Sequence, residues 1–85
     1  MASTTVTVAS AIGLHARPAN IIAEAVSDAG TAVTLSLVGG DPVDAGSALM
    51  IMTLGATHGT EVVVTSDDQQ ALDLVAKLVA TDLDA

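Results

Sequence analysis

The stretch Gly13-Leu14-His15-Ala16-Arg17-Pro18-Ala19 marks the point at which the chain changes from strand periodicity to helical periodicity. Before it, residues 4–9 alternate threonine and valine, a pattern typical of a half-buried β-strand. After it, apolar residues recur at helical spacing as far as Gly30, where a left-handed conformation can end a helix. The sequence therefore predicts a strand, a loop over residues 10–13 and an amphipathic helix that begins near Arg17-Pro18.

Further along the chain, three more segments carry strand signals. Alternating apolar residues predict strands over residues 31–38 and 60–65. Between them, a glycine-rich turn within residues 39–41 leads into a short strand around Pro42-Val43. Because proline cannot donate a backbone hydrogen bond, this short strand is expected at the edge of a sheet.

Two more helices are expected after the first. Ser47 can cap a short apolar helix over residues 48–52 that Gly55 would close. Asp67 or Asp68 can cap a last helix. The apolar stripe of this last helix is expected to consist of Leu72, Val75, Val79 and Leu83. The order strand–helix–strand–strand–helix–strand–helix predicts a single α+β domain over residues 1–85, with helices on one face of a sheet.

The composition restricts the classes of partner. Of 85 residues, 51% are apolar, so valine, isoleucine, leucine, alanine and methionine suffice for a core. A net charge of −8 with only two Lys or Arg residues disfavours nucleic acids and anionic membrane surfaces, since both are bound by cations. Without aromatic residues, platforms that stack bases or sugars are not expected, and without cysteine there is no disulfide or thiolate chemistry.

The sequence also lacks signals for membrane insertion or export. No apolar segment approaches the roughly 18 residues that indicate a membrane span. The N-terminus lacks the basic region and apolar run of a signal peptide. We therefore expect a cytoplasmic protein.

His15 and Arg17 make the opening stretch a candidate anion site. Imidazole is nucleophilic near neutral pH, and the first amides of a helix have no acceptor within it. If His15 precedes the helix, the amides of Ala16 and Arg17 and the guanidinium of Arg17 would hold a phosphoryl group on the ring. Alternatively, His15 only caps the helix and Arg17 faces solvent. The residue types alone leave both interpretations open.

The second histidine, His58, is expected to be an exposed loop residue. Two histidines without a third ligand make a poor transition-metal site. Asp67 and Asp68 are interpreted as helix caps rather than as a catalytic pair. We therefore expect neither a metal nor a cofactor.

Two motifs are similar to the signatures of a known family. The stretch from Gly13 to Ala19 resembles the phosphorylation motif of HPr, the histidine-containing phosphocarrier of the bacterial phosphotransferase system. The segment Ser47-Ala48-Leu49-Met50-Ile51-Met52-Thr53-Leu54-Gly55 resembles the second motif, and Gly59-Thr60 before a valine-rich strand also fits. The resemblance covers the whole chain. It implies an open-faced β-sandwich, a four-stranded antiparallel sheet with three helices on one face.

The resemblance also implies a role for individual residues. His15 would accept a phosphoryl group at Nδ1 from phosphorylated Enzyme I and pass it to EIIA domains for sugar uptake. Arg17 would neutralise the phosphoryl group, and the amides of Ala16 and Arg17 would hold it. Partners would dock on Ala48, Leu49, Met52 and Asn20. Such a protein is a monomeric phosphocarrier with a covalent phosphohistidine, not an enzyme.

Alternatives stay open at this stage. Ser47 is either a helix cap alone or also a regulatory site for a Ser kinase and phosphatase. Many relatives carry Lys directly before this serine and Gly three places after it, whereas Gly46 and Met50 stand here. The chain could instead serve a nitrogen-related branch, or regulate by binding without phosphotransfer, although His15 and Arg17 argue against the latter. Whether a C-terminal carboxylate approaches His15 is also open.

Overall fold

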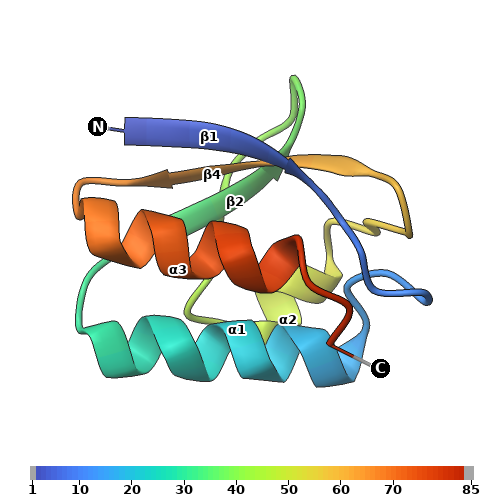
Figure 1. Cartoon of the computed structure of the whole chain (residues 1–85), viewed down its shortest axis with the longest axis horizontal. Helices are drawn as coiled ribbons and strands as arrows, with labels where there is room; N and C mark the ends of the chain where they lie inside the picture. Colours follow the sequence, from blue (N-terminus) through green and yellow to red (C-terminus); the bar gives the residue numbers. More distant parts are fainter. Residues whose placement is uncertain (1, 84–85) are drawn as a thin grey trace.

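In residues 2–83, the part of the chain described by the computed structural model, a four-stranded antiparallel sheet carries three helices on one face (Figure 1). The elements in chain order are β1 (Ala2–Thr7), α1 (Ala16–Ala29), β2 (Val33–Leu37), β3 (Val43–Asp44), α2 (Ala48–Met52), β4 (Glu61–Ser66) and α3 (Gln69–Val79). This confirms the predicted order of elements and the open-faced β-sandwich.

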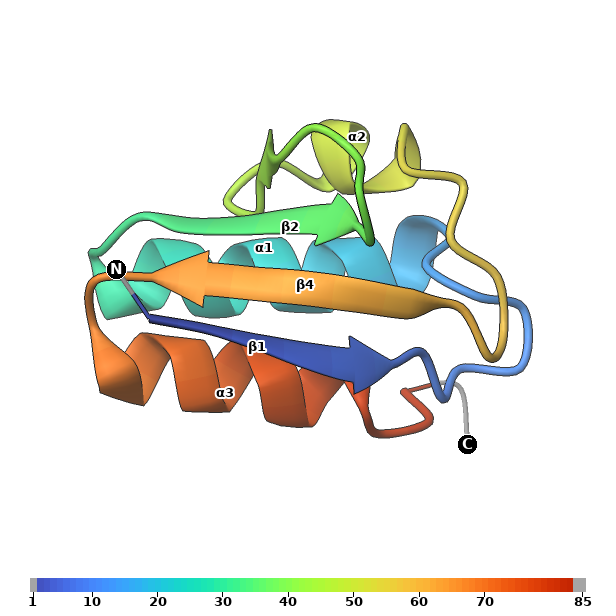
Figure 2. The same ribbon diagram turned by 90° about the horizontal axis from the view of Figure 1, so that it is seen from above.

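The strands lie in the order β1-β4-β2-β3, so the last strand of the chain occupies a central position (Figure 2). Val64 in β4 pairs with Thr4 on one side and with Leu35 on the other. Val62, Val64, Val33 and Leu35 are buried because alternate residues of these strands face the helices. The short strand β3 lies at the edge, as Pro42 predicts.

The predicted strand boundaries are wrong in detail. The first strand is Ala2–Thr7 rather than residues 4–9, because these six residues pair in register with β4 and Val8 already bonds to the loop before β4. β4 is shifted by one residue relative to the predicted 60–65. β2 is shorter than residues 31–38, since a turn closed by Gly40 N–H and the Leu37 carbonyl (2.9 Å) follows it.

The ends of the helices also differ in part from those that the sequence predicts. α1 begins at Ala16, so Pro18 is still in the first turn, where the absent N–H costs nothing. Gly30 ends α1 in the left-handed conformation (φ +69°), which confirms its predicted role. α2 spans Ala48–Met52 as predicted, with Thr53 as its C-cap. Gly55 lies two residues further on in the left-handed conformation (φ +65°), and its N–H donates to the carbonyl of Met52 at 3.2 Å. Leu83 lies beyond the end of α3 and is not part of its helical stripe.

The core between the sheet and the helices is built from aliphatic side chains. α1 contributes Ile22 and α2 contributes Ile51, both with no exposed surface. α3 buries the three predicted stripe residues within the helix: Leu72, Val75 and Val79. This aliphatic core fixes α1 and α2 relative to each other. The candidate site lies at the start of α1, which α2 packs beside (Figure 1).

Candidate functional site

His15 lies at the N-cap position of α1, directly before the first helical turn. Its backbone is extended (φ −80°, ψ −169°), and its carbonyl accepts the N–H of Ala19 at 3.0 Å. Its side chain, however, makes no capping hydrogen bond to the helix, and the residue is only half-buried. His15 therefore occupies the N-cap position without a side-chain capping bond, and Arg17 is exposed to solvent.

Two backbone amides at the start of α1 have no acceptor within the helix. The N–H groups of Ala16 and Arg17 belong to the first turn, where no helical carbonyl can accept from them. Pro18 has no N–H, and the N–H of Ala19 already donates to His15. The first turn contains no acidic residue, and the side chain of Arg17 is exposed. The dipole of α1 adds positive potential at the same end.

The segment before His15 is held by the loop that follows α2. The N–H of Leu14 donates to the carbonyl of Ala56 at 3.0 Å. Gly13 has φ +84°, and a Cβ at this position would overlap the carbonyl oxygen of Ala56 and the Cα of Thr57. Leu14 itself is buried. The sequence predicts a loop here, but this close approach of two backbones was not foreseen.

Ser47 is the N-cap of α2. Its Oγ accepts the N–H of Met50 at 3.3 Å. This confirms the predicted cap and explains how so short a helix begins at Ala48. Regulatory phosphorylation of Ser47 stays a prediction.

Exposed apolar side chains gather on α2, which packs against α1 and lies beside the half of it that begins at Ala16 (Figures 1 and 2). We call Leu49, Met50 and Met52 the α2 patch; they are 70%, 40% and 37% exposed. Ala48, also predicted to dock partners, is half-buried against the core, whereas Asn20 on α1 is exposed.

Sequence reasoning missed two exposed apolar residues near the site. Met50 belongs to the α2 patch, and Ile12, in the loop before His15, is 69% exposed. For Ile12, the position of a large aliphatic residue in a short loop could have indicated that its side chain is exposed. Met50 lies between two other apolar residues, Leu49 and Ile51, so the sequence did not indicate that its side chain is exposed.

The remaining predicted residues belong to segments other than α1. His58 is exposed in the loop between α2 and β4. Of the two candidate caps of α3, Asp68 takes the role, with its carboxylate accepting the N–H groups of Gln70 (2.9 Å) and Ala71 (3.4 Å). Within residues 2–83, no three His, Cys, Asp or Glu side chains gather as a metal site, and no helix is long and apolar enough to cross a membrane. The C-terminal carboxylate lies outside the described residues.

Similarity to known proteins covers nearly the whole chain. The family described as "PTS HPr component phosphorylation site" matches residues 2–81. Phosphocarrier protein HPr of Streptomyces coelicolor is 45% identical over 87 residues, covering 99% of this chain and 94% of the relative. A crystal structure of HPr-C-His from Thermoanaerobacter tengcongensis has a TM-score of 0.88 at 25% identity and covers 100% of this chain and 98% of its own. The crystal structure of a phosphocarrier protein HPr from Bacillus anthracis has a TM-score of 0.82 at 27% identity. The match covers 92% of this chain and 95% of the Bacillus anthracis chain.

Proposed function

Because the chain belongs to the HPr family of phosphocarrier proteins, we propose that His15 accepts a phosphoryl group from phosphorylated Enzyme I and passes it to EIIA domains. The observation that carries this proposal is the geometry at the start of α1. His15 stands at the N-cap with a side chain that does not cap the helix, beside two first-turn amides. As a phosphocarrier the protein is not a catalytic enzyme, since partner proteins form and remove its covalent intermediate.

The transfer is a nucleophilic displacement at phosphorus. The lone pair of His15 Nδ1 forms the new nitrogen–phosphorus bond while the bond between phosphorus and the donor breaks, and the donor keeps that electron pair. The amides of Ala16 and Arg17 and the Arg17 guanidinium stabilise the negative charge of the phosphoryl oxygens. In the second half of the cycle, a nucleophile on the EIIA domain attacks the same phosphorus and His15 leaves as neutral imidazole.

Arg17→Ala is expected to slow phosphorylation of His15 by roughly tenfold, because the phosphoryl oxygens lose a charged donor. The fold should be retained, since Arg17 is exposed and the buried residues of α1 are untouched. The initial rate of labelling from phospho-Enzyme I measures the first effect, and circular dichroism the second.

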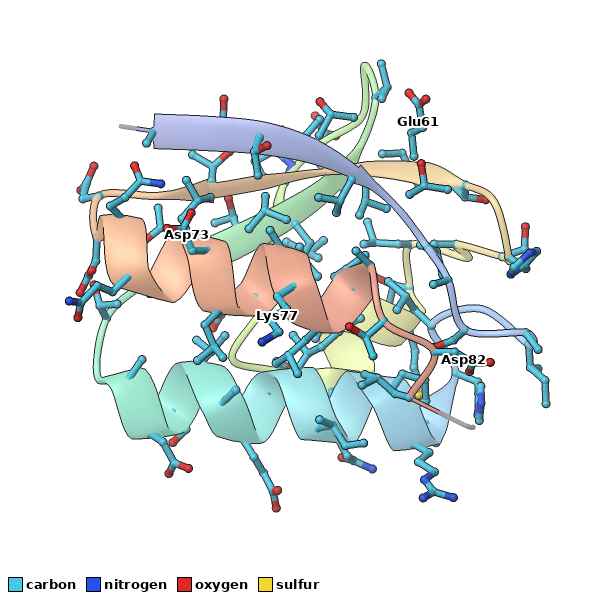
Figure 3. The ribbon with its side chains drawn as sticks, viewed as in Figure 1. Glu61, Asp73, Lys77 and Asp82 are labelled. Carbon is cyan, nitrogen blue, oxygen red and sulfur yellow. The ribbon has the colours of Figure 1, made fainter. Side chains whose placement is uncertain are left out.

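The matched control for Arg17 is Lys77→Ala. Lys77 is the only other Lys or Arg of the chain, and it lies in the last turn of α3 (Figure 3). Both variants change the net charge equally, so a general charge effect would slow both. Equal rates for the two variants would contradict a specific role of Arg17, and loss of helicity in Arg17→Ala would assign it a structural role.

The α2 patch is the surface we assign to partner docking. A phosphocarrier must present the same surface to its donor and its recipients, so contacts should be of modest affinity and short-lived. Leu49→Ala is expected to raise the KM for phosphorylation by Enzyme I by about fivefold, as for loss of a contributing interface side chain. Leu74→Ala on α3 is the control, since Leu74 is also an exposed leucine (42%). If Leu74→Ala raises KM as much as Leu49→Ala, docking does not centre on α2.

Labelling with the phosphotransferase proteins of the same genome tests the proposal as a whole. Phosphoenolpyruvate plus Enzyme I should give an acid-labile, base-stable phosphate on this protein. Adding each EIIA domain in turn should then transfer the label, and the acceptors distinguish a sugar branch from a nitrogen-related branch. Failure of the wild-type protein to accept any label would instead favour a regulatory binding module of the same fold.

Regulation and oligomeric state stay predictions. A phosphate on Ser47 would stand at the start of α2, where it would interact favourably with the first amides of the helix and add about two negative charges next to the α2 patch. Such a charge would oppose docking of an apolar partner surface. We also propose that the protein acts as a monomer.

A further inference from the structure

Ser10 joins the loop before His15 to the segment that follows α3. It is 1% exposed, and its Oγ accepts the N–H of Leu83 at 3.3 Å across a sequence separation of 73 residues. Next to it, the N–H of Ala9 donates to the carbonyl of Val79 at 3.1 Å. Figure 3 shows Asp82, the neighbour of Leu83, on the segment that leaves α3. The segment 80–83 is therefore attached to the loop that leads to His15.

A continuous set of backbone contacts leads from Ser10 to His15. The carbonyl of Ser10 accepts the N–H of Gly13 at 2.9 Å and closes the loop. Gly13 and Leu14 rest on the backbone of Ala56, as described above. Residues 11 and 12 are exposed and contribute no core packing. The position of the loop thus depends on its two ends, and Ser10 is one of them.

We propose that Ser10 is a positioning residue for phosphotransfer: by accepting the hydrogen bond from Leu83, it uses the segment 80–83 to fix the loop that presents His15. This inference rests on the proposed role of His15 as the phosphoryl acceptor. In-line displacement at phosphorus depends on the position of the attacking nitrogen, and a displacement of about 1 Å can lower a rate by up to two orders of magnitude. A buried serine hydroxyl with a partner far along the chain is well suited to limit such displacement.

Ser10→Ala tests this directly, because it removes one oxygen and leaves the backbone contacts of the loop in place. We expect the initial rate of His15 phosphorylation to fall about fivefold, a part of the loss that a full 1 Å displacement would cause. The ring-proton resonances of His15, measured by NMR without any phosphoryl donor, should shift or broaden. A merely structural role would lower stability without moving these two readouts.

The chain offers a closely matched control in Ser66→Ala. Ser66 is 3% exposed, donates to the carbonyl of Ala32 at 2.8 Å and accepts the N–H of Asp68 at 3.1 Å. It pairs with Ala2 at the start of β1, the end of that strand away from the His15 loop. Both variants remove a buried hydroxyl that is hydrogen-bonded to a backbone group far along the chain, so both should lower stability. Only Ser10→Ala should change the phosphorylation rate and the ring-proton resonances of His15.

A second pair of variants removes the donor rather than the acceptor. Leu83→Pro eliminates the N–H of residue 83, whereas Leu83→Ala keeps it and shortens only the side chain. We expect Leu83→Pro to reproduce the effects of Ser10→Ala, and Leu83→Ala to have a much smaller effect on His15. The double variant Ser10→Ala/Leu83→Pro should be no slower than either single variant, because both break the same hydrogen bond.

The outcomes separate this inference from the proposed function. If wild-type protein is phosphorylated and Ser10→Ala matches Ser66→Ala in rate and in His15 resonances, Ser10 has no positioning role. If wild-type protein is not phosphorylated at all, the proposed function fails. The His15 resonances of the same variants then still decide whether Ser10 and Leu83 hold the loop. If the resonances change in Ser10→Ala and Leu83→Pro but not in Ser66→Ala and Leu83→Ala, the positioning role of Ser10 is supported. If they change in none of the variants, that role is overturned.

Discussion

His15→Ala is expected to reduce labelling of the protein by phosphoenolpyruvate and Enzyme I to background. The variant lacks the imidazole at the N-cap of α1, so the proposed phosphohistidine cannot form there. The fold should persist, because the imidazole makes no capping hydrogen bond and the carbonyl bond to Ala19 belongs to the backbone. Acid-labile, base-stable phosphate is the quantity to measure, with circular dichroism as the check on folding.

His58→Ala is the matched control for this experiment. His58 is the other histidine of the chain and is exposed in the loop before β4. Its removal should leave the amount of label unchanged. Undiminished labelling of His15→Ala would refute the proposed function, and loss of label in His58→Ala alone would move the phosphorylation site to the other histidine.

Gly13→Ala is expected to lower the free energy of unfolding by about 3 kcal/mol, the largest stability effect we predict for one methyl group. Two costs add at this position. The backbone has φ +84°, which disfavours any residue with a Cβ, and the new methyl would overlap the backbone of Ala56 and Thr57. Because backbone atoms cannot move aside as a flexible side chain can, the loop before His15 must shift. Urea denaturation measures the loss of stability.

Gly59→Ala separates these two costs. Gly59 has nearly the same φ, +85°, but nothing lies within 4 Å of the position a Cβ would take. It should therefore lose only about 1 kcal/mol, the cost of the left-handed conformation. If the two variants are equally destabilised, the contact of Gly13 with Ala56 contributes nothing. The Gly13 variant should also be phosphorylated more slowly, since its loop presents His15.

The candidate site was accessible to sequence reasoning because its chemistry is local. His15, Arg17 and the first amides of α1 lie within a few residues of one another, and Pro18 indicates where the helix starts. The capping roles of Ser47 and Asp68 follow from the same kind of neighbourhood. Exposure was harder to predict: in α2 the pattern is apolar almost throughout, so the sequence could not show that Met50 is exposed while Ile51 is buried.

The sequence by itself determined the order of strands and helices, the start of α1 to within a residue or two, and the residues with which this chain resembles its family. These features depend on periodicity, capping and backbone preference, which act between near neighbours. Only the tertiary structure decided the sheet order β1-β4-β2-β3, the seating of Gly13 on Ala56 and the bond from Leu83 to Ser10. Each of these joins residues far apart in the chain, and their meeting depends on how the whole core packs.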